Sequence, residues 1–175
     1  MSVKRVSRGI LWTVFVLYGC VVFGILFMGG RHGGLYDDSL WDDIRYSVNL
    51  IPFQTIGGYM ADIWEKPWMR TLAIRNIFGN LILFYPMGVL LPCLFRGVRT
   101  FGKSLLIAIC TVFSVEAVQL LLRLGIFDID DFILNITGWI FGYFTFLIPM
   151  VRKILIHTNY LTDGSEKRDD EWQSD

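Results

Sequence analysis

Four apolar runs in this chain are long enough to cross the hydrocarbon of a membrane as helices. They cover Gly9 to Gly30, Asn76 to Phe95, Ser104 to Leu122 and Phe132 to Val151. Crossing about 30 Å of hydrocarbon takes about 20 apolar residues in a helix. Hydrophobic residues make up 54% of the chain and charged residues 18%, which is typical of an integral membrane protein. The runs therefore predict an all-α integral membrane protein, a four-helix transmembrane bundle.

The charged residues between the runs predict an orientation. Basic residues without acids precede the first run, join the second to the third and follow the fourth: Lys4, Arg5, Arg8, Arg96, Arg99, Lys103, Arg152 and Lys153. Acids outnumber bases in the other two connections, residues 31–75 and 124–131. By the positive-inside rule, both chain ends are cytoplasmic and these two connections are outside. The first run is longer than a signal core and no Ala-x-Ala-like site follows, so we expect a retained anchor.

The outer segment, residues 31–75, is too apolar for a simple loop. It contains seven aromatic residues of the kind that suit the membrane interface: Tyr36, Trp41, Tyr46, Phe53, Tyr59, Trp64 and Trp68. The stretch Val48 to Phe53 is apolar but too short to span, and Pro52 and the Gly57-Gly58 pair oppose a continuous helix. We expect residues 48–60 to form either a re-entrant segment or an interfacial cap lying on the bilayer.

Polar residues on three of the runs lie at similar depth. Asn80 is about 6 Å inward of Asn76, Glu116 about 10 Å inward of Arg123, and Asn135 about 6 Å inward of Asp131 at 1.5 Å per helical residue. Residues three, four or seven apart share one helix face. The spans are thus predicted to enclose a recess that opens outward. Its predicted lining is Asn76, Asn80, Glu116, Gln119, Arg123, Asp131 and Asn135, completed by Arg45 and Asn49, while Gly79, Gly88, Gly138 and Gly142 allow close helix contacts.

Glu116 is the one charge inside the four runs. An ionisable residue in a membrane span is a functional hypothesis by default, because hydrocarbon opposes its charge unless a partner or a wet cavity relieves it. The competing interpretation is structural: Glu116 and Arg123 form a buried ion pair, and Gln119 and the asparagines hydrogen-bond between helices. Both interpretations stay open.

Two kinds of chemistry have little support. Asp128, Asp130 and Asp131 could bind a hard cation, but acids before the fourth run also suit a helix N-terminus, and we favour Asp131 as its cap. No histidine accompanies them, which argues against zinc, so we expect no metal and no cofactor. Ser114 and Thr137 lack a nearby histidine and are expected to bond to their own helix backbone.

The motifs, taken together, resemble those of the VanZ-like family of bacterial membrane proteins. The resemblance is carried by Arg45 with Asn49-Leu50-Ile51-Pro52-Phe53, by Asn76-Ile77-Phe78-Gly79-Asn80 with Pro86 and Gly88, by Glu116-x-x-Gln119 and Arg123, and by Asp128-x-Asp130-Asp131 with Asn135, Gly138 and Gly142. It covers residues 10 to 150. We therefore expect a VanZ-like transmembrane domain over residues 1–156 and a disordered cytoplasmic tail over residues 157–175.

The resemblance implies a multi-pass protein of the bacterial cell membrane, in a family named for a member linked to resistance to teicoplanin-type glycopeptide antibiotics. One hypothesis is that the recess binds an envelope lipid head group or a lipid-linked cell-wall component, with ligand contacts from the predicted lining and Asp128. A second is a membrane enzyme acting on a lipid phosphate or glycosyl linkage, with Glu116 as base and Arg123 as anion clamp. A transporter is disfavoured because the inner halves lack polar residues. No nucleic-acid partner is expected.

Overall fold

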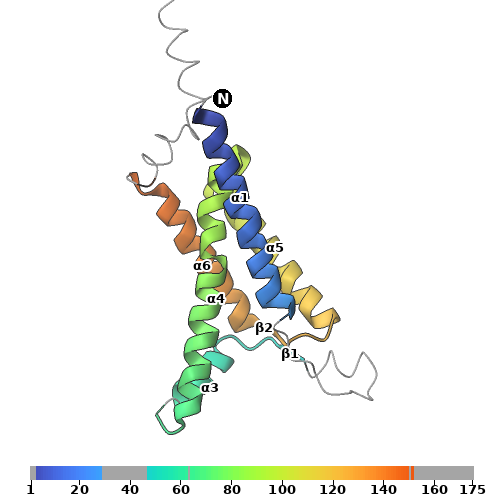
Figure 1. The fold of residues 1–175 in the computed structure, drawn as a ribbon. Helices are drawn as coiled ribbons and strands as arrows, with labels where there is room; N and C mark the ends of the chain where they lie inside the picture. The colour runs from blue at the N-terminus through green and yellow to red at the C-terminus, as the bar shows by residue number, and fades with distance from the viewer. Residues whose placement is uncertain (1–2, 29–46, 63, 150, 152–175) are drawn as a thin grey trace, which may run out of the picture.

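The computed structural model describes residues 3–28, 47–62, 64–149 and 151, and this part of the chain is mostly helical. Figure 1 follows the elements in chain order. They are α1 (Val3–Phe23), the π-helical turn η1 (Gly24–Met28), β1 (Val48–Asn49), α3 (Gln54–Asp62), α4 (Pro67–Leu94), the 3-10 turn η2 (Arg96–Val98), α5 (Phe101–Leu121), β2 (Phe127–Asp128) and α6 (Ile129–Leu147).

Three helical stretches are long and apolar enough to cross a membrane. These are Gly9–Met28, Pro67–Leu94 and Phe101–Leu121, and they overlap the first three predicted spans. The helix α6 covers most of the fourth predicted span and carries Asp130 and Asp131 in its first turn, and it is not among these three. An integral membrane protein is thus supported by three candidate spans, and the four-span bundle stays a prediction.

The amino-terminal end of α1 and the carboxyl-terminal end of α6 lie at the same end of the molecule (Figure 1). The short elements α3, β1 and β2 lie toward the other end. The number of membrane crossings and the side of the membrane that each end faces stay predictions.

The helix α4 begins earlier than expected. It starts at Pro67 rather than at Asn76, so the predicted outer segment ends sooner. Proline suits the first helical position, where its missing N–H would have no partner within the helix. Pro86 and Pro92 lie inside α4 without ending it.

The backbones of α4 and α6 touch at glycines. A Cβ atom on Gly138 would lie 2.0 Å from the carbonyl oxygen of Leu81, and one on Gly142 would lie 2.0 Å from that of Tyr85. From the α4 side, a Cβ on Gly88 would lie 2.1 Å from the Trp139 carbonyl oxygen. The predicted close approach is confirmed at these three glycines. It is wrong at Gly79, where a Cβ would meet nothing within 4 Å.

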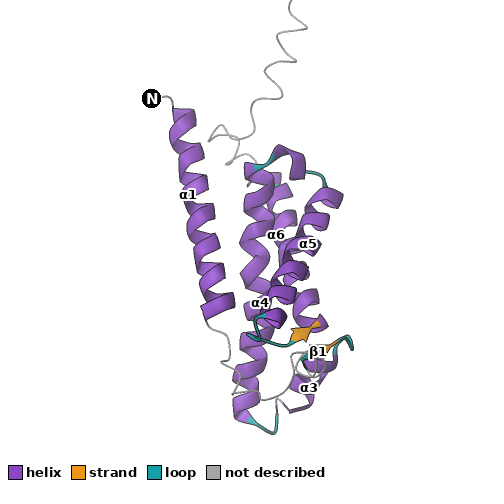
Figure 2. Cartoon of the chain, turned by 90° about the vertical axis from the view of Figure 1, so that its right-hand side faces the viewer, coloured by secondary structure: helices purple, strands orange, loops and turns teal. Residues whose placement is uncertain are grey.

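The buried core lies where α5 packs against α4 and α6 (Figure 2). Phe84 stacks on Trp139 with ring centroids 6.5 Å apart, and the Trp139 indole donates a hydrogen bond to the Ser104 hydroxyl at 3.1 Å. Trp139 is 1% exposed, so this bond satisfies a polar group that water does not reach. The core residues are Phe84, Leu91, Val98, Ala108, Val112 and Trp139.

A short parallel pairing ties the outer segment to the turn before α6. Val48 pairs with Phe127, and Asn49 pairs with Asp128. The helix α3 follows Pro52 and runs through Gly57 and Gly58, so the expectation that these glycines oppose a helix is wrong. No residue of α3 is buried, and the helix packs on α4. The choice between a re-entrant and an interfacial segment stays a prediction.

Candidate functional site

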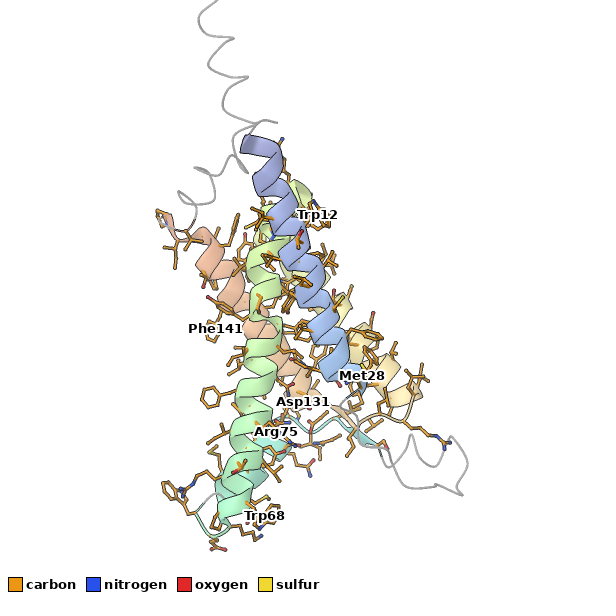
Figure 3. All side chains as sticks on the ribbon, viewed as in Figure 1. Trp12, Met28, Trp68, Arg75, Asp131 and Phe141 are labelled. Atoms are coloured by element: carbon orange, nitrogen blue, oxygen red, sulfur yellow. The ribbon has the colours of Figure 1, made fainter. Side chains whose placement is uncertain are left out.

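A cavity of about 910 Å³ lies between η1, α3, α4 and the start of α6. Its polar lining comes from Thr55, Asn76, Asn80, Asp128 and Asp131, together with Arg75. Figure 3 labels Arg75 and Asp131 in the part of the molecule near β1 and β2. The rest of the lining is mainly apolar: Ile25, Leu26, Leu72, Ile74, Phe78, Ile82, Leu83 and Ile126, with Tyr59 and Gly79.

Asp131 brings α4 and α6 together at this cavity. Its Oδ1 atom accepts a hydrogen bond from Asn76 Nδ2 at 3.0 Å and another from Asn80 Nδ2 at 2.6 Å. Asn76 and Asn80 are one helical turn apart, so both amides reach the same oxygen. The predicted convergence of these three residues is confirmed, and their role toward a ligand stays a prediction.

Asp128, rather than Asp131, caps α6. Its carboxylate accepts the backbone N–H of Asp130 at 2.9 Å, in the arrangement of a helix N-cap. The favoured assignment of the cap to Asp131 is therefore wrong, because the helix begins at Ile129 and leaves Asp131 inside its first turn.

Asp128 also bonds to the outer segment. Its Oδ2 accepts the Thr55 hydroxyl at 2.5 Å, and its Oδ1 lies 3.4 Å from Asn49 Nδ2. Asn49 Nδ2 also lies 3.1 Å from the Thr55 hydroxyl oxygen. Asn49 thus belongs to the polar cluster as expected, although it does not line the cavity. Thr55 is a cavity residue that the sequence analysis missed.

Asp130 has a structural role that the sequence analysis also missed. Its side chain is 0% exposed, and its carboxylate accepts the backbone N–H groups of Phe53 at 2.5 Å, Thr55 at 2.9 Å and Ile56 at 3.0 Å. These amides stand at the start of α3, where a helix leaves N–H groups without internal partners. An acid from α6 thus satisfies them. The signal in the sequence was the absence of a Ser, Thr, Asp or Asn directly before Gln54.

Arg123 departs from the predicted polar stripe. The helix α5 ends at Leu121, and Arg123 follows in the left-handed region with φ 56°. Its side chain is exposed, and it does not line the cavity. The stripe was expected to continue through Arg123, and the helix end prevents this. Helix ends are among the features that residue patterns locate least well.

Gln119 reaches a different helix from the one expected. Its Nε2 donates a hydrogen bond at 2.9 Å to the backbone carbonyl of Leu26 in η1. It does not line the cavity. The structural interpretation, a hydrogen bond between helices, describes its observed contact.

Glu116 and Asn135 are buried and lie outside the cavity lining. Glu116 is 6% exposed, and no residue that the structure describes gives its carboxylate a hydrogen bond or an ion pair. Asp131 and Asp128 are near enough to repel it electrostatically. Asn135 is 2% exposed, and its Oδ1 atom has no hydrogen-bond partner within the described part of the chain. The expected ion pair with Arg123 is not found in this region, and Arg45 lies outside the described residues.

The hydroxyls of Ser114 and Thr137 behave as expected. Ser114 donates to the Cys110 carbonyl and Thr137 to the Ile133 carbonyl, each at 2.7 Å. Both bonds lie within one helix turn. These two hydroxyls are thus used by their own helices.

Comparison with known proteins bears on the motifs that surround the cavity. The sequence profile of the VanZ/LLP1 family matches residues 15–152. The chain belongs to the VanZ/LLP1 family. Protein VanZ of Enterococcus faecium is a relative, 27% identical over 139 residues, which are 79% of this chain and 72% of that protein. No solved structure matches.

The VanZ/LLP1 match contains every residue that lines the cavity. It also contains the three glycines of the α4–α6 contact and the carboxylate of Asp130. The family resemblance predicted over residues 10 to 150 is thus confirmed.

Proposed function

We propose that this VanZ-family membrane protein binds the polar head group of an envelope lipid or lipid-linked cell-wall component in its cavity. By doing so, it alters the access of lipid-anchored glycopeptides to the membrane surface and lowers susceptibility to teicoplanin-type antibiotics. The cavity then faces outward and the two chain ends face the cytoplasm.

The amphiphilic lining of the cavity carries this proposal. Asn76, Asn80 and Asp131 form a hydrogen-bonded polar floor, whereas residues such as Phe78 and Ile82 provide apolar walls. A lipid head group with the first part of its chains has both kinds of surface. The volume also falls within the range of about 300–1,000 Å³ that is common for small-molecule sites.

A susceptibility measurement tests the proposal. A strain that lacks the gene is complemented with the wild type or with Asn76→Leu/Asn80→Leu, which removes both amides from the cavity floor. We expect the deletion and the double variant to raise susceptibility to teicoplanin equally, with a smaller change for a glycopeptide that lacks a lipid tail. Ser114→Ala is the control, because this hydroxyl bonds to its own helix. Unchanged teicoplanin susceptibility on deletion would contradict the link to resistance.

Direct binding separates the two parts of the proposal. The purified protein is reconstituted with bacterial envelope lipids, and the lipids it retains in detergent are identified by native mass spectrometry. Retention by the wild type and loss in Asn76→Leu/Asn80→Leu is the expected result. Equal retention by both proteins would place binding outside the cavity.

An enzyme acting on a lipid linkage is the second candidate. The observation in its favour is the buried carboxyl of Glu116, which no described residue bonds. Glu116 does not line the cavity. An enzyme that uses it as a base would therefore need its substrate to reach Glu116 outside the cavity. Comparing lipid and cell-wall profiles of wild type and Glu116→Gln tests it, since a catalytic base would leave a substrate accumulating in the variant.

A further inference from the structure

Hydrogen bonds within the protein already engage the two amides and the hydroxyl of the polar floor. Asn76 Nδ2 and Asn80 Nδ2 both donate to Asp131 Oδ1, and the Thr55 hydroxyl donates to Asp128 Oδ2. An asparagine beside a carboxylate must present its NH₂ group, because an ionised carboxylate accepts hydrogen bonds and donates none. The assignment of these donors therefore follows from their partner.

The carboxylate of Asp131 also has an acceptor oxygen that these bonds do not use. Asp131 Oδ2 accepts no hydrogen bond from any residue that the structure describes, since both asparagines bond to Oδ1. Asn76 Oδ1 is buried and without a partner in the same part of the chain. A buried polar atom without a partner is unfavourable. A ligand that donates a hydrogen bond can pair with Asp131 Oδ2, the acceptor that these bonds leave unused.

The charged residues of the lining indicate which kind of head group fits the cavity. Asp128 and Asp131 line the cavity, and Glu116 lies near both. Arg75 is the basic residue of the lining, is exposed, and has no hydrogen bond or ion pair with the described residues. A purely anionic head group would be repelled by the acids of the floor. In a zwitterionic head group, the positive group can lie near Asp128 and Asp131 and the negative group near Arg75.

We propose that the ligand of this cavity carries a protonated primary amine, which donates hydrogen bonds to Asp131 Oδ2, while Arg75 binds its phosphate. This inference rests on the proposed function and specifies its ligand class. Two sources share this chemistry: an aminophospholipid, and a lipid-linked peptide with a free amine.

A head-group series tests the amine on the wild-type protein. The full-length chain in nanodiscs is offered phosphatidylethanolamine, its N-methylated forms, phosphatidylcholine and phosphatidylglycerol, and retained lipid is measured by native mass spectrometry. Phosphatidylcholine keeps the positive charge without an N–H donor, and phosphatidylglycerol has no amine. We expect binding to fall with each methyl group and to be about tenfold weaker for phosphatidylcholine, as for loss of a hydrogen bond to a charged group.

Substitution of Asp131 tests the acceptor. Asp131→Asn keeps an oxygen for the two asparagines and puts an NH₂ group in place of Oδ2. We expect phosphatidylethanolamine to bind about tenfold more weakly, with little change for phosphatidylglycerol. Asp62→Asn is the matched control, because this acid lies outside the cavity and pairs with Lys66 at the surface. Thermal unfolding checks that both variants are folded, and the head-group series stands if Asp131→Asn is not.

Arg75→Gln tests the phosphate contact. Arg75 is exposed, so its replacement leaves the packing of α4 intact. We expect weaker binding of phosphatidylethanolamine and phosphatidylglycerol by similar factors. Unchanged binding of both lipids would remove Arg75 from the site.

The possible outcomes distinguish failure of the amine contact from failure of the proposed head-group binding. Equal binding of phosphatidylethanolamine and phosphatidylcholine, or no effect of Asp131→Asn, overturns the amine contact while head-group binding stands. Failure to retain any offered lipid or lipid-linked precursor overturns both. A lipid-linked pentapeptide with its lysine amine free or acetylated distinguishes the sources. Preference for its free form, without any preference among phospholipids, assigns the amine to the cell-wall precursor.

Discussion

The contact between α4 and α6 has two parts with opposite character. In one part, Gly88, Gly138 and Gly142 bring the two backbones together so closely that a Cβ atom has no room. In the other, Asn76, Asn80 and Asp131 bond across the helices and border a cavity of about 910 Å³. The same two helices thus provide a rigid joint and an open site.

This difference assigns separate tasks to packing and to polar contacts. Glycine contacts between helices have no side chains that could rearrange, so they fix the position of α6 on α4. The carboxylate of Asp131 is thereby held at a defined place, while its Oδ2 atom accepts no hydrogen bond from the residues that the structure describes. Its neighbour Asp130 has the opposite role, because it is fully buried and bonded to three amides of the outer segment.

The largest effect is expected at the glycine contact. In Gly138→Ala the new Cβ meets the Leu81 carbonyl oxygen, which cannot move without displacing α4. We expect the free energy of unfolding in detergent to fall by about 4 kcal/mol. Gly79→Ala on α4 is the control, since its Cβ meets open space and alanine favours helix by about 0.5 kcal/mol. Similar losses in both variants would contradict a rigid joint.

The next effect concerns the bonds from α6 to the outer segment. Asp130→Ala leaves the amides of Phe53, Thr55 and Ile56 without their acceptor. We expect a loss of about 3 kcal/mol in unfolding free energy, and faster hydrogen exchange at these three amides. Asp62→Ala, which breaks an exposed pair with Lys66, should change stability by less than about 0.5 kcal/mol. Unchanged exchange at the α3 amides would show that Asp130 does not hold this helix.

Replacing Glu116 tests whether this buried carboxyl serves the function while lowering the stability of the protein. Because no described residue bonds its buried carboxyl, Glu116→Leu should raise the free energy of unfolding by about 1 kcal/mol. Teicoplanin susceptibility of the complemented strain, measured alongside, should rise if Glu116 serves the function. Glu116→Gln separates loss of charge from loss of the polar group. A loss of stability in both variants would mean that Glu116 is a structural residue.

The smallest effect is expected for Gln119. Gln119→Leu removes one hydrogen bond to the Leu26 carbonyl, which is worth about 0.6 kcal/mol between membrane helices. Thr13→Val is its control, because Thr13 bonds within its own helix and is exposed. Lipid retention should be unchanged in both. A large loss of lipid binding in Gln119→Leu would show that Gln119 belongs to the lipid-binding site.

Part of the site could be predicted from helical spacing. Asn76 and Asn80 lie one turn apart on one helix, so any partner that meets one meets both, and Asp131 does so. Gly138 and Gly142 were recognisable as a contact by the same spacing. Glu116 and Gln119 share the correct helix, yet their surroundings differ from those expected. Glu116 is buried and bonds to no residue in the described part of the chain, whereas Gln119 reaches η1, which continues α1.

The apolar runs and their spacing determined the helical class, three of the candidate spans and the family, because these depend on residues close together in the chain. Tertiary structure alone decided that Asp130 binds the amides of α3. The physical reason is that a carboxylate bonds whichever donors are brought within about 3 Å. For Asp130 those donors lie 74 to 77 residues away in the chain.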